Sequence, residues 1–171
     1  MTAHTLIDSS QIHARVTEMG VEISNDLAGQ DVIVLCVLKG ALFFTADLMR
    51  AMKMDAALDF IQVSSYGNKK QSSGVVTLHK EPQLDPSGKA VLIVEDIIDS
   101  GLSMSEVHRY MEGRGATVVK VATFLDKPAS RRVPFKADYV GFTIEPKFVV
   151  GYGLDFDEKY RGLSEIQVLE D

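Results

Sequence analysis

One stretch of sequence decides the fold of this chain: Val91-Leu92-Ile93-Val94-Glu95-Asp96-Ile97-Ile98-Asp99-Ser100-Gly101-Leu102-Ser103. It begins as an aliphatic run, turns acidic at Glu95 and Asp96, and reaches a third carboxylate at Asp99. A loop of small residues then leads into a pattern typical of a helix. A buried strand that ends in carboxylates and opens a helix through a tight loop predicts a ligand site at the strand end.

Strands and helices alternate on both sides of this stretch. Short apolar runs rich in Val and Ile indicate buried strands, and apolar residues at helical spacing indicate amphipathic helices. The alternation predicts an α/β fold with a mainly parallel, twisted sheet flanked by helices. We predict helices over 9–27 (capped by Ser9 or Ser10), 41–52 and 104–113, and strands over 32–38, 58–64, 91–94, 118–124, 139–144, 148–150 and 166–169.

The segment from Ser65 to Gly74 separates two of these predicted strands. It is polar and rich in Gly and Ser, which predicts a mobile loop of about ten residues. A short strand at 75–78 is expected on its far side.

Composition limits the location and the partners of the chain. Its 171 residues suffice for one domain, and the formal net charge of −6 disfavours nucleic-acid binding, whose electrostatic footprint is basic. The single cysteine, Cys36, cannot form an intrachain disulfide, which is typical of a reducing compartment. We expect no signal peptide at Met1–His4 and find no apolar run of about 20 residues. We therefore expect a cytoplasmic protein that binds neither membrane nor nucleic acid.

Polar residues follow three of the predicted strands, at the point where each strand ends. These residues are Lys39-Gly40, the stretch from Glu95 to Ser103, and Asp126-Lys127. Right-handed crossovers bring the carboxyl ends of parallel strands to one edge of the sheet. The sequence therefore predicts lysines and carboxylates at a common edge, where ligands bind in such sheets.

The loop from Ser100 to Ser103 has two interpretations. Backbone N–H groups at a helix start suit a phosphate, Gly101 allows close approach, and the two serine hydroxyls add donors. An ordinary capped helix start explains the same residues. The Walker pattern is excluded, because the chain contains no Gly-Lys-Ser/Thr tripeptide.

The three carboxylates likewise permit more than one role. Glu95 and Asp96 would point to opposite faces of a regular strand, so they suit sugar hydroxyls or the waters of a bound Mg²⁺ better than joint chelation. A solvated acidic turn is the alternative. Asp99, at the mouth of the loop, is a candidate general base or a simple loop cap.

The whole stretch resembles the phosphoribosyl-diphosphate (PRPP) motif of the type I phosphoribosyltransferases, over thirteen consecutive positions. The resemblance extends over nearly the entire chain and is to the hypoxanthine (hypoxanthine–guanine) branch, at a bacterial-type length. It departs in having Ser at both hydroxyl positions, where Thr is frequent, and Leu102 where some relatives have Lys. The other matching segments are Leu38-Lys39-Gly40, Ser65-Tyr66-Gly67, Lys127, Lys147 to Gly151, Leu154-Asp155 and Arg161.

Carried over by position, the resemblance implies how the chain would hold PRPP. The 5′-phosphate would be bound by Asp99, Ser100, Gly101, Leu102 and Ser103. The ribose hydroxyls and a Mg²⁺ ion would be held by Glu95 and Asp96. The pyrophosphate would be held by Lys39, Gly40 and Arg161. The flexible loop would close over the reaction centre with Ser65 and Tyr66.

The resemblance also implies a purine site. Lys127 would donate to the 6-oxo group, Phe148 would stack on the base, the Val149 backbone would read the base edge, and Asp155 would hold a Mg²⁺ ion. Asp99 would accept a proton near N7 and so act in catalysis. Because Lys127 is a pure donor, it favours a carbonyl oxygen at purine C6 over an amino group.

The implied enzyme transfers the phosphoribosyl group of PRPP to N9 of hypoxanthine or guanine. The resemblance further implies one domain over 1–171, with a core at about 9–145 and a small hood from about 146–171 together with the N-terminal residues. It also suggests a homodimer or homotetramer.

Three alternatives share parts of the pattern. A receiver domain is excluded, because too few residues follow Asp96. A PRPP-binding regulator is disfavoured by the acidic charge and the lack of length for an added domain. A xanthine–guanine enzyme shares most of the motif, and the sequence does not rank the 6-oxopurines.

Overall fold

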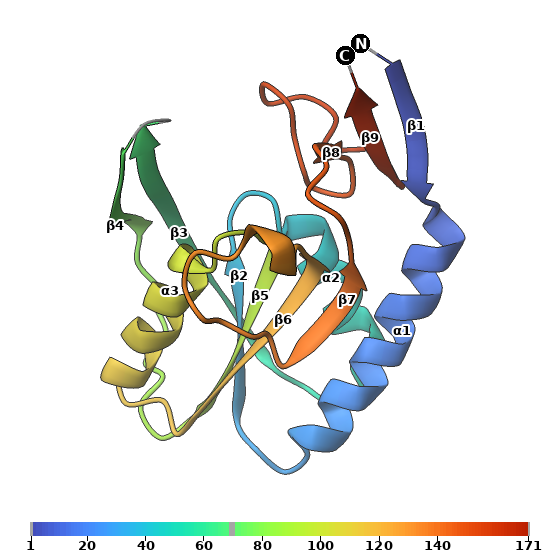
Figure 1. Ribbon diagram of the computed structural model, residues 1–171. Helices are drawn as coiled ribbons and strands as arrows, with labels where there is room; N and C mark the ends of the chain where they lie inside the picture. Colours follow the sequence, from blue (N-terminus) through green and yellow to red (C-terminus); the bar gives the residue numbers. More distant parts are fainter. Residues whose placement is uncertain (1, 69–70, 171) are drawn as a thin grey trace.

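A six-stranded sheet forms the centre of the computed structural model, which describes residues 2–68 and 71–170. In chain order its strands are β2 (Val32–Val37), β3 (Ala57–Asn68), β4 (Gln71–Lys80), β5 (Ala90–Ile98), β6 (Val118–Asp126) and β7 (Tyr139–Thr143). In space they lie in the order β4-β3-β2-β5-β6-β7 (Figure 1). Neighbouring strands from β3 to β7 pair in parallel, whereas β4 pairs antiparallel with β3. The predicted α/β fold with a mainly parallel sheet is confirmed.

Helices cover both faces of this sheet. Helices α1 (Ser9–Asp26) and α2 (Leu42–Ala51) pack on one face, α3 (Leu102–Gly113) packs on the other, and a single 3₁₀ turn, η1 (Pro128–Ser130), follows β6. A hydrophobic core lies on each face of the sheet, and alternate residues of β5 point into one or the other. Leu92 and Val94 lie in the core beneath α1 and α2, and Val91 and Ile93 lie in the core beneath α3. Within the described ranges, no helix has the length and hydropathy needed to cross a membrane.

A second, three-stranded sheet joins the two ends of the chain. Its strands are β1 (Thr2–Ile7), β8 (Val149–Val150) and β9 (Ile166–Glu170), and β9 pairs antiparallel with both others. Thr2 pairs with Glu170, so the two ends of the described chain lie side by side (Figure 1). We predicted no strand at Thr2–Ile7, where all but the last two residues are exposed.

The predicted cap of the first helix is wrong. Asp8 is the N-cap: its Oδ1 accepts a hydrogen bond from the Gln11 amide at 2.9 Å, and the Gln11 side chain accepts one from the Asp8 amide at 2.9 Å. This reciprocal capping box satisfies two N–H groups, whereas a serine cap supplies one acceptor. Ser9 and Ser10 lie inside the helix.

The predicted ten-residue loop at 65–74 is also wrong over the residues that the structure describes. The backbone of β3 continues to Asn68 and that of β4 begins at Gln71, and these two residues pair with each other. Antiparallel pairing satisfies the backbone groups of this polar segment, so a hairpin forms without an apolar pattern. Residues 69–70 of the predicted loop lie outside the described residues.

Candidate active site

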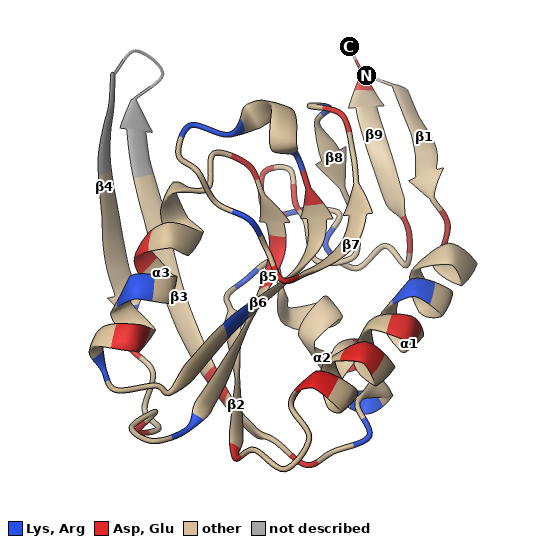
Figure 2. Cartoon of the chain, turned by 60° about the horizontal axis from the view of Figure 1, so that its bottom comes forward, with Lys and Arg blue, Asp and Glu red and all other residues tan. Residues whose placement is uncertain are grey.

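The candidate site lies where three neighbouring strands end. Strands β2, β5 and β6 are adjacent and parallel, so their carboxyl ends meet at one edge of the sheet, as predicted. Acidic residues mark the ends of β5 and β6 at this edge (Figure 2). All three polar segments named from the sequence thus reach a common place.

Glu95 and Asp96 form a pair of acids near the end of β5. Glu95 is 8% exposed, and its Oε1 accepts a hydrogen bond from the Asp96 amide at 2.9 Å. Burial raises the pKa of both carboxyls. The negative charge of Asp96 raises the pKa of Glu95 further. The positive charge of Arg161 partly opposes the rise in the pKa of Asp96. Neither carboxylate takes part in an ion pair among the described residues. Such a pair favours a ligand that brings hydroxyl donors or positive charge.

These acids contact the loop after β2 through a glycine. A Cβ atom on Gly40 would overlap the Oδ2 atom of Asp96, and a Cβ atom on Gly153 would overlap the carbonyl oxygen of Gly40. Gly153 also has a φ of +102°, which favours glycine. The segments that contain Gly40, Asp96 and Gly153 are far apart in the sequence and pack directly against one another, with no room for a side chain at either glycine.

The side chains at this site could hold a metal ion only if water or a bound substrate supplied the remaining coordinating oxygens. The described part of the chain contains no group of three or more His, Cys, Asp or Glu side chains arranged to hold a metal ion. Asp155 pairs with Arg161 Nη2 at 3.1 Å and accepts a hydrogen bond from the Glu158 amide at 2.9 Å. Buried Glu95, half-buried Asp96 and Asp155 supply hard oxygen donors, which suit a cation that keeps waters or substrate oxygens as its other ligands.

The loop after β5 has the geometry of an anion site. Gly101 is the N-cap of α3, has a φ of +85°, and contributes no side-chain cap to the first turn. A Cβ there would come within 3.1 Å of Phe135 Cβ and within 3.3 Å of Arg131 Cδ, so glycine suits both the space and the conformation. Ser100 Oγ lies 3.3 Å from the Leu102 amide as its acceptor. The helix dipole, together with an N-cap residue that offers no side-chain acceptor, favours a phosphate over the ordinary capped start.

Asp99 and Lys127 face each other across the ends of β5 and β6. Lys127 is 8% exposed, and its Nζ atom lies 3.9 Å from Oδ2 of Asp99, whose side chain is 57% exposed. The Lys127 amide donates to the Ile98 carbonyl at 3.0 Å, which ties the two strand ends together. The buried ammonium group can donate a hydrogen bond to a polar ligand, and the exposed carboxylate can accept one from it.

Arg131 organises these strand ends, and the sequence interpretation missed it. Its guanidinium donates to the carbonyls of Asp99 at 2.9 Å, Ile98 at 3.1 Å and Lys127 at 3.3 Å, and it pairs with the carboxylate of Asp126. The one available signal was its place one turn after Lys127-Pro128. The five donors of arginine suit this role, which lysine could not fill.

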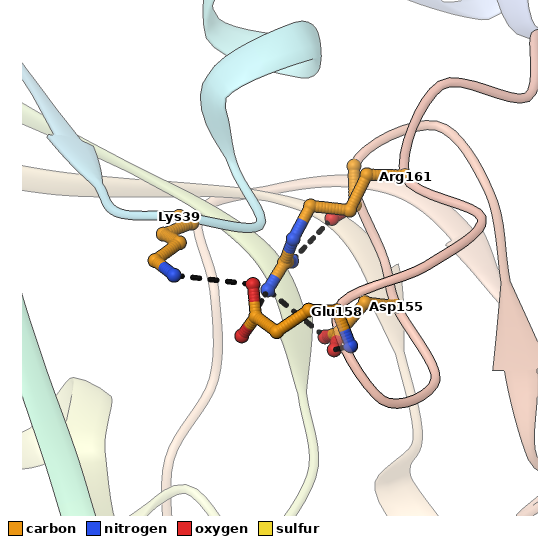
Figure 3. Close-up of polar contacts among 5 residues, drawn as sticks. Lys39, Asp155, Glu158 and Arg161 are labelled. Carbon is orange, nitrogen blue, oxygen red and sulfur yellow. Dashed lines mark hydrogen bonds and ion pairs between the residues drawn. The ribbon is translucent and has the colours of Figure 1, made fainter.

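Lys39 and Arg161 approach a common acid, Glu158 (Figure 3). Lys39 Nζ lies 3.1 Å from Glu158 Oε2, and Arg161 Nη2 lies 3.4 Å from Glu158 Oε1. Arg161 also donates to the Gly153 carbonyl at 2.7 Å, which holds its guanidinium against the Gly153 segment. The structure thus brings together two predicted pyrophosphate residues, with a carboxylate between them that the sequence interpretation did not single out.

An aromatic pair borders the same region. Phe148 is 53% exposed, and its ring lies 5.7 Å from that of Phe156 in an edge-to-face arrangement. Val149 beside it is buried in β8. An exposed phenylalanine supported by a second ring suits stacking on a planar ligand. Phe156 was not predicted, because nothing in the sequence places it beside Phe148.

The residues of the predicted flexible loop are not brought to these groups by any described contact. Ser65 is exposed and pairs with Val76 within the hairpin. The backbone of Tyr66 belongs to β3, and its side chain lies outside the described part of the structure.

Comparisons with known proteins agree with this geometry. The family model described as "Phosphoribosyl transferase domain" matches residues 5–157. The hypoxanthine-guanine phosphoribosyltransferase of Mycobacterium tuberculosis is 44% identical over 171 residues, covering 96% of this chain and 85% of the relative. That of Bacillus subtilis is 44% identical over 165 residues, covering 96% and 92%. The crystal structure of a Bacillus anthracis hypoxanthine-guanine phosphoribosyltransferase aligns with a TM-score of 0.93 at 42% identity, covering 98% of each chain.

Proposed function

The chain belongs to the phosphoribosyltransferase family, and on this basis we propose that it transfers the 5-phosphoribosyl group of PRPP to N9 of hypoxanthine or guanine. The products are IMP or GMP and pyrophosphate, so the reaction salvages purine bases. The observation that carries the choice of base is Lys127, a buried cation at 3.9 Å from Asp99. A purine with a 6-oxo group accepts a hydrogen bond from the Lys127 ammonium group. The 6-amino group of adenine is itself a donor and would leave that ammonium group without an acceptor.

Asp99 has two tasks in this proposal. Its backbone begins the loop that holds the 5′-phosphate with Ser100, Gly101, Leu102 and Ser103, and its carboxylate accepts the proton that the purine loses. The exposed side chain of Asp99 can reach a base that lies against Lys127. The Arg131 guanidinium holds the Asp99 carbonyl, so the carboxylate is presented from an anchored backbone.

Lys39, Gly40 and Arg161 hold the leaving pyrophosphate. Negative charge grows on this group as the bond to the ribose carbon breaks, and two cations placed in advance stabilise that charge. The contacts among Gly40, Asp96 and Gly153 set the distance between the diphosphate site and the ribose site. Ser65 and Tyr66 would close over the reaction centre and exclude water, which otherwise hydrolyses the activated ribose.

The metal in this proposal is Mg²⁺, held by Glu95, Asp96 and Asp155 together with substrate oxygens. When bound, it supplies a Lewis acid that neutralises the diphosphate and orients it. The two acids fit this role because burial raises the pKa of both carboxyls, and a ligand with positive charge or hydroxyl donors relieves the cost of keeping them ionised.

The sheet formed by β1, β9 and β8 acts as the hood in this proposal. It carries Phe148 and Val149 at its β8 edge, and the base would stack on Phe148 while the Val149 backbone reads its edge. The core at about 9–145 carries the phosphate and ribose contacts. The two parts meet at Gly40 and Gly153.

The protein of this proposal is a cytoplasmic homodimer or homotetramer. The adjacent side chains of Leu42 and Phe43 are 46% and 42% exposed, which supports a homodimer or homotetramer that covers them. The free, buried Cys36 is consistent with a cytoplasmic protein. Sedimentation at several protein concentrations and cell fractionation measure these two properties.

Steady-state kinetics with PRPP and each of hypoxanthine, guanine, xanthine and adenine test the function. We expect turnover with hypoxanthine and guanine and none with adenine. A preference for xanthine would favour the xanthine–guanine alternative. PRPP binding without turnover of any base, together with retardation of nucleic acid in a gel, would favour a regulator.

A further inference from the structure

Glu158 places a carboxylate between the two cations assigned to pyrophosphate. One of its oxygens lies 3.1 Å from Lys39 Nζ and the other lies 3.4 Å from Arg161 Nη2 (Figure 3). Lys39 follows β2, and Arg161 lies just before β9. A single acid therefore bridges two segments that are distant in the chain.

The backbone at Glu158 is unfavourable for this residue type. Asp157 and Glu158 have φ angles of +52° and +61°, and they form a two-residue turn closed by paired hydrogen bonds between Phe156 and Lys159. A turn with two positive φ angles favours Asn and Gly, not Glu. Exposed ion pairs add little to stability, so folding alone does not explain an acid at this position.

The charge state of Glu158 matches its position. A glutamate side chain has an ordinary pKa of about 4.3, well below neutral pH. Glu158 is therefore a carboxylate at neutral pH, and its two oxygens meet the two cations as the oxygens of a phosphoryl group would.

We propose that Glu158 acts as an internal substitute for pyrophosphate: it holds Lys39 and Arg161 in the empty site and is displaced when the diphosphate of PRPP binds. The inference rests on the proposed function, because it takes Lys39 and Arg161 as the pyrophosphate residues. Arg161 keeps Asp155 as a partner at 3.1 Å after the exchange, so its guanidinium stays in place. Glu158 thereby lowers the affinity of the site for pyrophosphate and speeds its release.

Calorimetric titration with inorganic pyrophosphate, at fixed Mg²⁺ and without purine, measures the exchange directly. We expect Glu158→Gln to bind pyrophosphate about 3- to 10-fold more tightly than the wild type, because one charge that competes for the exposed Lys39 and the half-buried Arg161 is removed. Asp157→Asn is the matched control: it removes the neighbouring carboxylate of the same turn, which is exposed and makes no described ion pair, and should leave the affinity unchanged.

Glu158→Gly provides a second variant that folds at least as well, because glycine accepts the positive φ angle. It should show the same tightening. Unchanged or weaker pyrophosphate binding in both Glu158 variants would overturn the inference, and continued synthesis of IMP by the wild type would then leave the proposed function intact. A wild type that binds neither pyrophosphate nor PRPP would overturn both.

Discussion

The ammonium group of Lys127 lies 3.9 Å from the carboxylate of Asp99, at the ends of two adjacent parallel strands. The lysine is buried and the aspartate side chain is more than half exposed. Both residues are tied to the same guanidinium, that of Arg131, through their backbone carbonyls. The backbones that carry this donor and this acceptor are therefore anchored to each other by the protein itself.

Replacing Asp99 by Asn removes the proposed proton acceptor and keeps the shape of the side chain. We expect turnover to fall by about 10²- to 10⁴-fold, the usual effect of losing a positioned acid or base. PRPP binding should change little, because the backbone of the phosphate loop is retained. An unchanged rate at saturating substrates would remove Asp99 from this role.

Lys127→Ala should weaken the binding of hypoxanthine and guanine by about 10- to 100-fold, the value of a charge-assisted hydrogen bond. Affinity for PRPP should hardly change. Lys120→Ala is the matched control, because Lys120 lies on β6, the strand that ends directly before Lys127, and its side chain is 40% exposed. Equal losses for the base and for PRPP would mean that Lys127 is structural.

Arg131→Ala should lower the free energy of unfolding by about 3 kcal/mol, because it leaves Asp126 and several carbonyls without their partner. Arg131→Lys keeps the charge but loses the fork of donors, so we expect a reduced kcat even where the protein stays folded. Urea denaturation and kinetics measure the two effects. Arg132→Lys, at an exposed position, should leave both unchanged.

Glu95→Gln should stabilise the ligand-free protein at neutral pH. Burial raises the pKa of Glu95 in the folded state, so the folded protein binds more protons than the unfolded chain above about pH 4, and the free energy of unfolding falls as pH rises. The amide does not ionise, so the variant does not lose stability in this way as pH rises. Thermal unfolding measured across pH should show a flatter profile for the variant, and PRPP should bind it more weakly. A variant that unfolds at a lower temperature would contradict the assignment.

Chelation of divalent metal should abolish turnover, and added Mg²⁺ should restore it. The residues described at the site provide only part of a coordination shell, so the ion is expected to exchange readily. Full activity in EDTA would exclude a metal from the reaction.

The central sheet could be predicted because its strands are short, apolar and separated by polar residues. The strand from Val32 to Val37 and the start of β5 are buried at every position, which leaves their pattern without ambiguity. The sequence also predicted that Lys39, Glu95 and Lys127 lie at one edge of the sheet, because each follows or ends a parallel strand. The family pattern supplied the separate tasks of these residues.

The contacts of Arg131 and Glu158 could not be predicted in this way. Arg131 acts through backbone carbonyls, which carry no sequence signal, and Glu158 meets Lys39 across 119 positions. The hairpin formed by β3 and β4 escaped prediction for a related reason. Its pairing depends on backbone groups, while its composition indicates a loop.

The pairing of β1 with β9 has a consequence for the order in which the protein is made. Among the described strands β1 is synthesised before all the others and β9 after them, about 10 to 30 s later at ordinary rates of translation. The segment that carries Arg161 lies between β8 and β9, so it is synthesised long after Lys39 and Gly40. A nascent chain therefore contains Glu95, Asp96 and the loop from Ser100 to Ser103 well before it contains Arg161, so the groups brought together at this edge of the sheet are completed only by the last part of the described chain.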